Sequence, residues 1–329
     1  EISLGLVGSE MCIRDSFYSQ LPRKAYASQD GLCCVDTLHR VTITGLEKNT
    51  TYFYRVLSQE VKELLPYRPV LGNIVSTDIW EKPLTFTTLD GRQETLSIVM
   101  INDIHGKNDL QKKLLERAPP QNVDMVVFCG DMCNYINKQS DIFTGFLDTS
   151  VGLFASRKPF VYVRGNHETR GAYARNFFRY LAGPEGKFYY AFTYGPIRFI
   201  VLDSGEDKPD TDVEYSGLVD FDNYILEQKE WLARELESPE FRAASFRVVL
   251  SHIPFGKGSW YGSERLRKQL LPLLESVRID LMLSGHNHAF GFMDKGKVTA
   301  FPIIVNSNNS VLTCLLYTSD AADEARSVD

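Results

Sequence analysis

From about residue 96 onward, short apolar runs alternate with stretches whose apolar residues recur at helical spacing. The runs that predict strands are residues 95–101, 124–130, 159–165, 188–204, 246–252 and 281–286. Of these, 188–204 is long enough for a hairpin that turns at Gly195-Pro196. The stretches that predict helices are residues 110–118, 142–149, 172–181, 225–236 and 263–277. This alternation is typical of a layered α/β domain, in which ligands bind beyond the carboxyl ends of the strands.

Five of the predicted strands end in side chains that can bind a metal ion. In chain order these are Asp103 and His105, Gly130-Asp131, Gly165-Asn166-His167-Glu168, His252, and Gly285-His286-Asn287-His288. Taken singly, a Gly-Asp pair is usually a turn and a lone histidine often caps a helix. Taken together at one edge of a sheet, oxygen and imidazole ligands indicate a metal centre. Of the six histidines, the one outside these motifs is His39, for which we expect a structural role.

This combination of Asp-x-His, Gly-Asp, Gly-Asn-His-Glu, His and Gly-His-x-His resembles the calcineurin-like metallophosphoesterases, from about Leu96 to Ala289. The resemblance implies a β sandwich flanked by helices, with two metal ions at one edge. It implies a first metal held by Asp103, His105, Asp131 and His288. The second metal would be held by Asp131, Asn166, His252 and His286, so that Asp131 bridges the two ions. His167 would face the substrate, off both metals.

The chemistry of phosphate esters explains this choice of residues. Two cations about 3.5–4 Å apart neutralise the ester and lower the pKa of a bridging water toward ~7, so that hydroxide attacks phosphorus in line. His167 is then expected to protonate the leaving oxygen as a general acid. Glu168 and Asn287 are expected to orient the ligands from behind. The glycines of the motifs are expected to let the backbone turn sharply beside the ions.

Two features near the motifs are less specific. Arg170 could grip phosphate as a charged fork, or it could be a solvated arginine at a helix start. The acidic run 203–215 is expected to be a solvated surface loop rather than a metal site.

A closer resemblance is to the purple acid phosphatases and their bacterial relatives, through the EQKEWL stretch at 227–232 and a fibronectin-like domain before the catalytic one. Two positions depart from that branch. Asn134 stands where the iron-binding tyrosine of Gly-Asp-x-x-Tyr would be, and Tyr135 is one residue off. His105 replaces the glycine of the usual Asp-x-Gly. We therefore expect two divalent or trivalent ions (Mn, Zn or Fe) without an iron-tyrosinate site.

Residues 17–90 read as strands, and Leu46, Thr50 and Tyr52 resemble the tyrosine corner of fibronectin type III domains, with Lys48 in place of the usual proline. This sandwich is expected to be incomplete. Cys33 and Cys34 are adjacent and poorly placed to bridge each other. Cys129 and Cys133 are expected to be buried small residues.

The two ends of the chain can be encoded by complementary DNA words. Residues 10–16, EMCIRDS, and residues 314–319, CLLYTS, resemble one sequencing adapter read outward at both ends. We expect residues 1–16 and 314–329 to be adapter sequence, 17–90 a partial fibronectin-like domain, and 91–313 a catalytic domain cut at its end. On the resemblance, the intact protein is expected outside the cytoplasm, periplasmic or secreted.

Charge and composition narrow the function classes. The formal net charge is −6, so there is no basic footprint for nucleic acid, and no apolar run approaches the roughly 20 residues of a membrane span. The resemblance implies a small-molecule phosphate ester as the substrate, with a monoester as the leading hypothesis. A phosphodiesterase or nucleotidase with the same core is the alternative. A catalytically silent binding module is a third reading, against which the intact ligand set argues.

Overall fold

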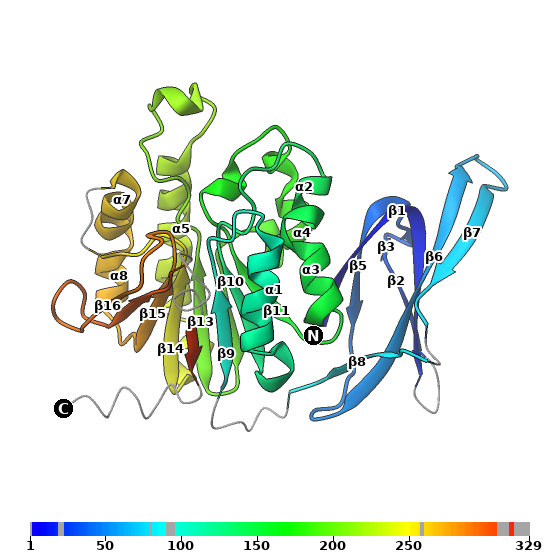
Figure 1. Ribbon diagram of the computed structural model, residues 1–329, viewed down its shortest axis with the longest axis horizontal. Coiled ribbons are helices and arrows are strands. Elements are labelled where there is room, and N and C mark those ends of the chain that lie inside the picture. The colour runs from blue at the N-terminus through cyan, green and yellow to red at the C-terminus, as the bar shows by residue number, and fades with distance from the viewer. Residues whose placement is uncertain are drawn as a thin grey trace. The chain divides into compact units, whose positions relative to one another are not determined.

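The chain is described by a computed structural model, which covers residues 2–18, 23–78, 81–89, 96–256, 260–307 and 316–318. It divides into two compact units, Glu1–Gly91 and Arg92–Asp329, which are described one at a time (Figure 1).

The first unit is built from antiparallel strands. The main sheet contains β1 (Ile2–Tyr18), β2 (Arg23–Tyr26), β5 (Asp36–Ile43), β6 (Thr51–Glu63), β7 (Val70–Ser76) and β8 (Leu84–Thr87). Its order is β2-β1-β6-β7, with β5 paired to β1 and β8 paired to β6. A small hairpin joins β3 (Ser28–Gln29) to β4 (Leu32–Cys33).

A small apolar cluster holds this sheet together. Val41, Ile43, Tyr54 and Phe86 are buried, as the alternation of the sequence predicts for one face of the strands. The hydroxyl of Tyr52 accepts a hydrogen bond of 2.7 Å from the backbone N–H of residue 47, which is the contact that the tyrosine-corner pattern predicts. The fibronectin type III identity of the unit stays a prediction. His39 is buried and its Nε2 donates to the Asp36 carbonyl, in keeping with a structural role.

The second unit contains two sheets. One has the order β11-β10-β9-β18, from β9 (Ile98–Ile101), β10 (Met125–Cys129), β11 (Phe160–Val163) and β18 (Leu316–Thr318). The other has the order β12-β13-β14-β15-β17-β16. Its strands are β12 (Tyr190–Tyr194), β13 (Ile197–Leu202), β14 (Phe246–Ser251), β15 (Leu281–Ser284), β16 (Gly291–Met293) and β17 (Ile303–Val305). The hairpin of β12 and β13 turns at Gly195-Pro196 as predicted.

Helices cover the outer faces of the two sheets (Figure 1). The longer ones are α1 (Asn108–Arg117), α5 (Phe221–Glu235) and α7 (Tyr261–Gln269), followed by α8 (Leu271–Glu275) and the short α6 (Pro239–Ala243). Residues 140–155 form one helical segment from α2 (Ser140–Ile142), η2 (Phe143–Leu147), α3 (Asp148–Ser150) and η3 (Val151–Ala155). Short helical turns lie at η1 (Pro120–Asn122), η4 (His167–Thr169), η6 (Pro184–Gly186) and η7 (Val213–Tyr215).

Two predicted helices are broken. Residues 172–181 form η5 (Ala174–Asn176) and α4 (Phe178–Leu181) instead of one helix, and the bonds from Asn176 N–H to the Tyr173 carbonyl and from Phe177 N–H to the Ala174 carbonyl span only three residues. The predicted helix 263–277 is split into α7 and α8 because Pro272, at the start of α8, has no N–H to continue the ladder.

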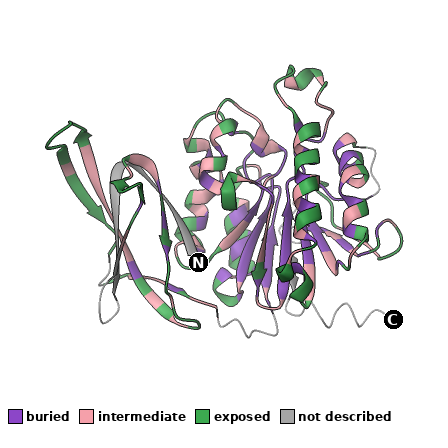
Figure 2. Cartoon of the chain, turned by 180° about the vertical axis from the view of Figure 1, so that it is seen from behind, coloured by how far each residue is buried: buried purple, intermediate pink, exposed green. Residues whose placement is uncertain are grey.

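The core lies between the sheets and under the helices, where strands β9, β10 and β13 are buried along their whole length (Figure 2). The hydroxyls of Tyr190 and Tyr194 donate from β12 to the carbonyls of Tyr162 and Asp124, 3.2 Å away in each case. Strands β9, β10 and β11 are parallel, as are β13, β14 and β15. Their carboxyl ends therefore deliver the residues that follow them to one edge of the unit.

The adapter prediction concerns residues 1–16 and 314–329. Residues 308–315 and 319–329 lie outside the described part of the chain, so that prediction is not tested by the structure. Among the helices of the described residues, none is both long and apolar enough to cross a membrane.

Candidate metal centre

The strand ends bring carboxylates and imidazoles together. Three overlapping groups each have ligand atoms within 4.8 Å of one another: Asp103 with His105 and His288, His105 with Asp131 and His167, and Asp131 with His252 and His286. Asn166 joins them through its Oδ1, 3.2 Å from Nδ1 of His286. The structure thus collects in one place all seven residues that the sequence proposes as metal ligands, and Asp131 lies between the two halves of the set.

Five of these residues have backbone dihedrals that residues other than glycine rarely adopt. The φ angles of Asp103, His105, Asp131, His286 and His288 lie between 50° and 70°. Such left-handed conformations cost about 1–3 kcal/mol each and persist where the surroundings enforce them. Here the enforcing contacts include the backbone bonds from Asp103 N–H to the Gly130 carbonyl and from His105 N–H to the Asp131 carbonyl, both 2.9 Å.

The glycines of the motifs serve mainly to permit close approach. A Cβ on Gly165 would lie 2.1 Å from Oδ1 of Asp131, and one on Gly285 would lie 2.8 Å from Oδ2 of Asp103. Among the three motif glycines, Gly130 alone has a positive φ, +83°. The expectation of sharp turning therefore applies to Gly130 alone, but a side chain at any of the three positions would collide with a ligand, since a Cβ on Gly130 would lie 2.3 Å from Nδ1 of His252.

Asp103 is fully buried and its orientation is set by its neighbours. Its Oδ2 accepts from the Asn102 side chain at 2.5 Å and from the His286 backbone at 2.9 Å. The side chain of Asn306 in turn donates to Asn102 at 2.7 Å. The other oxygen, Oδ1, faces Nε2 of His288 at 3.1 Å. This arrangement aims one carboxylate oxygen at the imidazoles.

Glu168 orients the loop that carries Asp131. Its carboxylate accepts from the backbone N–H groups of Asp131 and Cys133, both at 2.9 Å, and of Gly165 at 2.8 Å. Burial, followed by the charge of Asp131, raises the pKa of Glu168 to about 7. Glu168 thus ties the second and third motifs together from behind the ligands, and is not itself directed at the centre.

The histidines show why cations fit this site. Nε2 of His105 and Nε2 of His288 face each other at 3.1 Å. Nε2 of His286 is buried and has no hydrogen-bond partner among the residues that the structure describes, and the buried Nε2 of His252 lies 3.2 Å from Oδ2 of Asp131. Imidazole nitrogens gathered around shared carboxylates are the donor set that Mn, Zn or Fe takes. Nδ1 of His252 donates to the Cys129 carbonyl at 2.7 Å, which leaves Nε2 as the ligand atom.

The charges of the centre are strongly coupled. Burial favours the neutral form of His252, but Asp131 and Asp103 outweigh it and raise its pKa to about 10. Burial would raise the pKa of Asp131, but the charges of His252 and His167 hold it well below the usual range. Burial lowers the pKa of His105 and of His286 to about 4. A hydrogen bond to Asp103 raises the pKa of His288.

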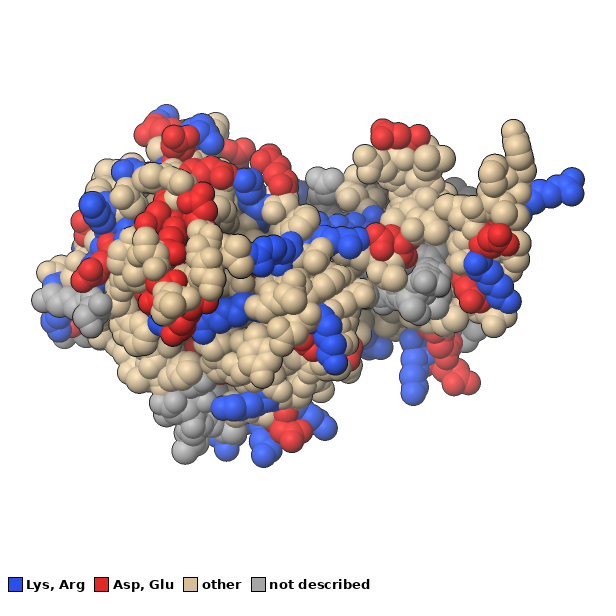
Figure 3. Space-filling model, turned by 90° about the horizontal axis from the view of Figure 1, so that it is seen from above, with Lys and Arg blue, Asp and Glu red and all other residues tan. Residues whose placement is uncertain are grey.

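Acidic side chains gather on the face that carries the centre (Figure 3). Glu206 and Asp207 lie close to the motifs, in addition to the carboxylates of the centre itself. Without cations such a face repels an anion. A phosphate ester would therefore bind here only with positively charged ions in place.

His167 stands beside the centre with its ring fixed. Its Nδ1 lies 2.8 Å from the Asn134 carbonyl, to which it must donate because a carbonyl only accepts. Its Nε2 consequently faces the pocket side, 3.8 Å from Oδ2 of Asp131 and 3.2 Å from Nη1 of Arg170. Its backbone N–H donates to Oδ1 of Asp131 at 2.9 Å.

Arg170 is occupied by a carboxylate. Its Nε and Nη2 donate to the two oxygens of Glu206 at 2.9 and 2.8 Å. Thr169 and Tyr215 also donate to Glu206. Most of the guanidinium donors that could bind phosphate are thus already bonded to Glu206. Neither expectation for Arg170, a phosphate ligand or a solvated arginine, describes this contact.

The expectation of a solvated loop at 203–215 is wrong for its first part. Asp203 and Glu206 are buried, and Asp203 pairs with Nη2 of Arg164 at 2.6 Å. The sequence pattern of alternating charge could not reveal partners that lie 36 or more residues away. Residues 208–215 are partly or fully exposed, as predicted.

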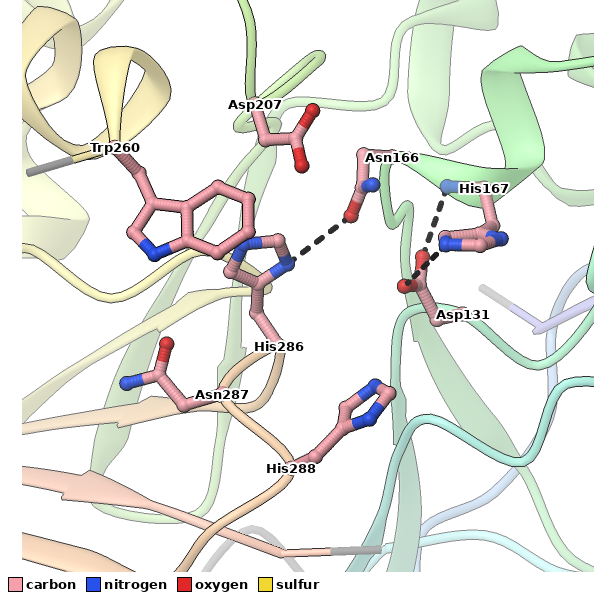
Figure 4. Close-up of a pocket in the computed structure, with 8 residues that line it drawn as sticks. All are labelled: Asp131, Asn166, His167, Asp207, Trp260, His286, Asn287 and His288. Carbon is pink, nitrogen blue, oxygen red and sulfur yellow. Dashed lines mark hydrogen bonds and ion pairs between the residues drawn. The ribbon is translucent and has the colours of Figure 1, made fainter.

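A pocket of about 480 Å³ opens over the centre (Figure 4). Its lining combines predicted residues with two that the sequence did not single out: Asp131, Asn166, His167, His286, Asn287 and His288, together with Asp207 and Trp260. Asn287 lines the pocket instead of standing behind the ligands. No signal at the strand ends could have found Trp260, because it precedes a helix.

The expectation of a centre without an iron-tyrosinate site stays a prediction. Asn134 is exposed and supplies a backbone carbonyl to His167. Tyr135 is 54% exposed and is not among the residues that line the pocket. Cys129 and Cys133 are buried as predicted, and burial raises the pKa of both thiols.

Known proteins with similar sequences include purple acid phosphatases. Purple acid phosphatase 22 of Arabidopsis thaliana is 24% identical over 273 residues, which cover 77% of this chain and 53% of that protein. Purple acid phosphatase 23 of the same plant is 24% identical over 321 residues, 84% of this chain and 62% of that protein. The chain therefore spans less than two thirds of these relatives.

The fold class predicted from the sequence is confirmed. The structure of a purple acid phosphatase from yellow lupin (Lupinus luteus) seeds matches with a TM-score of 0.66 at 16% identity, covering 96% of this chain and 63% of that one. A sequence model described as calcineurin-like phosphoesterase matches residues 96–290, which include every residue of the candidate centre. The chain belongs to the calcineurin-like phosphoesterase family.

Proposed function

We propose that this chain hydrolyses phosphate monoesters with two metal ions. The observation that carries the proposal is the set of imidazole nitrogens and carboxylate oxygens that converge within 4.8 Å. The likeness to purple acid phosphatases supports a monoester as the substrate.

The residues divide into two ligand sets that share one carboxylate. Asp103, His105 and His288 would hold the first ion, and Asn166, His252 and His286 the second, with Asp131 common to both. Bound there, the ions would neutralise the charge of the ester and lower the pKa of a coordinated water. In the net reaction water adds to phosphorus, the P–O bond to the leaving group breaks, and that oxygen takes up a proton.

His167 is the residue that we assign to the proton transfer. Its ring is oriented by the Asn134 carbonyl, so that Nε2 faces the pocket and accepts from Nη1 of Arg170 at 3.2 Å; to act as the acid, Nε2 would give up that contact and take up a proton. The two ligand sets above are complete without His167, although its Nε2 lies within 4.8 Å of ligand atoms of His105 and Asp131.

A panel of esters tests the proposal. Protein loaded with Mn or Zn should hydrolyse phosphomonoesters faster than diesters, and the Asp131→Ala variant should hydrolyse neither. Faster turnover of diesters would assign a phosphodiesterase to the same core. No turnover of any ester, with two ions bound per chain, would leave a silent binding module.

A location outside the cytoplasm is part of this proposal. It is supported by the resemblance to purple acid phosphatases, together with the β unit that this chain carries before the catalytic one. Fractionation of cells that express the intact natural protein would test it, and recovery in the cytoplasmic fraction would contradict it.

A further inference from the structure

Trp260 exposes a large aromatic surface at the wall of the metal pocket. The residue is 52% exposed and directly precedes α7. Its ring packs edge-to-face on the imidazole of His286, with ring centres 5.5 Å apart and planes 78° apart. The contact with a proposed ligand fixes the indole beside the centre and leaves the rest of its surface open to the pocket.

Polar groups flank this aromatic wall. Asp207 is largely buried yet lines the pocket, where its carboxylate is held loosely, 3.5 Å from Nη2 of Arg170 and from the Tyr215 hydroxyl. Asn287 lines the pocket near Trp260 and offers both a donor and an acceptor (Figure 4). An aromatic face between an acceptor and an amide is suited to a planar ring that carries hydroxyl or amino groups.

We propose that Trp260, Asp207 and Asn287 form a subsite for the leaving group of the ester, and that this group is a nucleoside. The inference rests on the proposed phosphomonoesterase function. The base would stack on Trp260, and the sugar hydroxyls or base amino groups would donate to Asp207.

The position of the subsite favours a leaving group in which a spacer separates the ester oxygen from the aromatic ring. Trp260 and His167 lie on opposite sides of the pocket (Figure 4). If the leaving oxygen takes its proton from His167, the aromatic ring of the leaving group can reach Trp260 only when several bonds separate that ring from the oxygen. The ribose of a nucleoside provides this separation. A ring bonded directly to the ester oxygen would stay nearer His167.

The charge of the subsite favours a monophosphate. Asp207 lines the pocket, whereas the neighbouring Glu206 is buried and paired with Arg170. Additional phosphate groups on the leaving side would meet the Asp207 carboxylate. A nucleoside monophosphate leaves a neutral group there.

The test compares kcat/KM for three monoesters in the metal-loaded protein. The esters are adenosine 5′-monophosphate, 4-nitrophenyl phosphate and glycerol phosphate. In Trp260→Ala, the ratio for adenosine monophosphate over glycerol phosphate should fall about tenfold, as expected for a lost base-stacking contact. Trp260→Phe should restore most of the ratio. Asp207→Ala should lower the ratio of adenosine monophosphate to 4-nitrophenyl phosphate.

The outcomes separate this inference from the function on which it rests. An unchanged ratio in Trp260→Ala, with metal content preserved, would overturn the subsite and leave Trp260 as a packing residue for His286. Absence of turnover with all three esters would overturn the proposed function instead. In that case adenosine alone still tests the subsite, because it should quench the fluorescence of the unmodified protein more than that of Trp260→Phe, and equal quenching would refute it.

Discussion

Arg170 and Glu206 form a two-pronged ion pair beside the candidate centre, with N–O distances of 2.9 and 2.8 Å. Glu206 is 1% exposed, whereas the Arg170 side chain is 31% exposed. The remaining nitrogen of the fork, Nη1, lies 3.2 Å from Nε2 of His167. The pair thus connects the acidic loop to the residue that we assign to proton transfer.

Replacing Arg170 with Ala should destabilise the protein. The change leaves the Glu206 carboxylate buried without its cation, which costs ~3–5 kcal/mol in a fully buried pair. Because Arg170 is partly exposed and water screens its charge, we expect a loss of about 2 kcal/mol in the free energy of unfolding. Urea unfolding measures the loss. Arg170→Lys keeps the charge but not the fork, so its free energy of unfolding should lie between those of the unmodified protein and the Ala variant. A loss below about 0.5 kcal/mol in the Ala variant would show that Thr169 and Tyr215 satisfy Glu206 by themselves.

His167→Ala should slow turnover while leaving metal content near normal. The backbone N–H of residue 167, which holds Asp131 at 2.9 Å, survives the change. Loss of a positioned acid costs about 10²–10⁴-fold in rate. The loss should shrink for nitrophenol, a leaving group that needs little protonation. Kinetics with good and poor leaving groups measure this, alongside metal analysis. Equal slowing of both, or an emptied metal site, would contradict the general-acid role, and Asp131→Ala should show that second behaviour.

The residues of the centre could be predicted because their pattern is local. Each ligand motif follows an apolar run, and parallel strands carry such motifs to one edge. The seven ligand candidates needed no knowledge of long-range contacts. Their left-handed backbone conformation could not be predicted, because an Asp-x-His sequence is equally compatible with a left-handed turn and with an extended loop. The strain at Asp103 and His105 arises from cross-strand bonds to the loop at 130–131.

The outer part of the site could not be predicted for a related reason. Asp203, Glu206 and Asp207 read as a charged loop, and their burial depends on Arg164 and Arg170 in another loop. Trp260 reads as one more aromatic residue before a helix. Its place in the pocket lining depends on the tertiary fold, which no periodicity encodes.

Gly165→Ala should disrupt metal binding without changing a ligand. The added Cβ would lie 2.1 Å from Oδ1 of Asp131 and 2.4 Å from its backbone nitrogen, so the bridging carboxylate must move. Metal content per chain and activity should both fall. Gly152→Ala is the matched control, because a Cβ there meets nothing within 4 Å and the residue is helical. That control should be neutral or stabilising by up to ~1 kcal/mol. Full metal occupancy in Gly165→Ala would mean that the loop relaxes freely.

Iron-loaded protein should show no tyrosinate-to-iron absorption band. Asn134 occupies the position of the iron-binding tyrosine, and Tyr135 is 54% exposed and is not among the residues that line the pocket. Visible spectroscopy after loading with ferric iron checks this. Asn134→Tyr provides the contrast, since a phenol at that position could approach the centre. A band in the unmodified protein that disappears in Tyr135→Phe would show that Tyr135 reaches the metal.

Metal uptake should release protons, and the number should depend on which histidine is present. In the metal-free protein Asp131 and Asp103 hold the pKa of His252 at about 10 against the effect of burial, so His252 carries a proton at pH 7. A metal ligand must be neutral, so binding displaces that proton. His105 and His286, with pKa values near 4, are already neutral and release none. Apparent affinity should therefore rise with pH between 6 and 8, about tenfold per unit for each displaced proton.

Calorimetry with Mn in two buffers of different ionisation enthalpy counts these protons. His252→Asn and His286→Asn make a matched pair, because each removes one imidazole ligand and weakens binding. His252→Asn should release about one proton fewer than the unmodified protein at pH 7, since the displaced proton belonged to the missing ring. His286→Asn should release as many as the unmodified protein. Equal proton release by the two variants would mean that the carboxylates do not hold a proton on His252, and that the positive charge of the metal-free centre lies elsewhere.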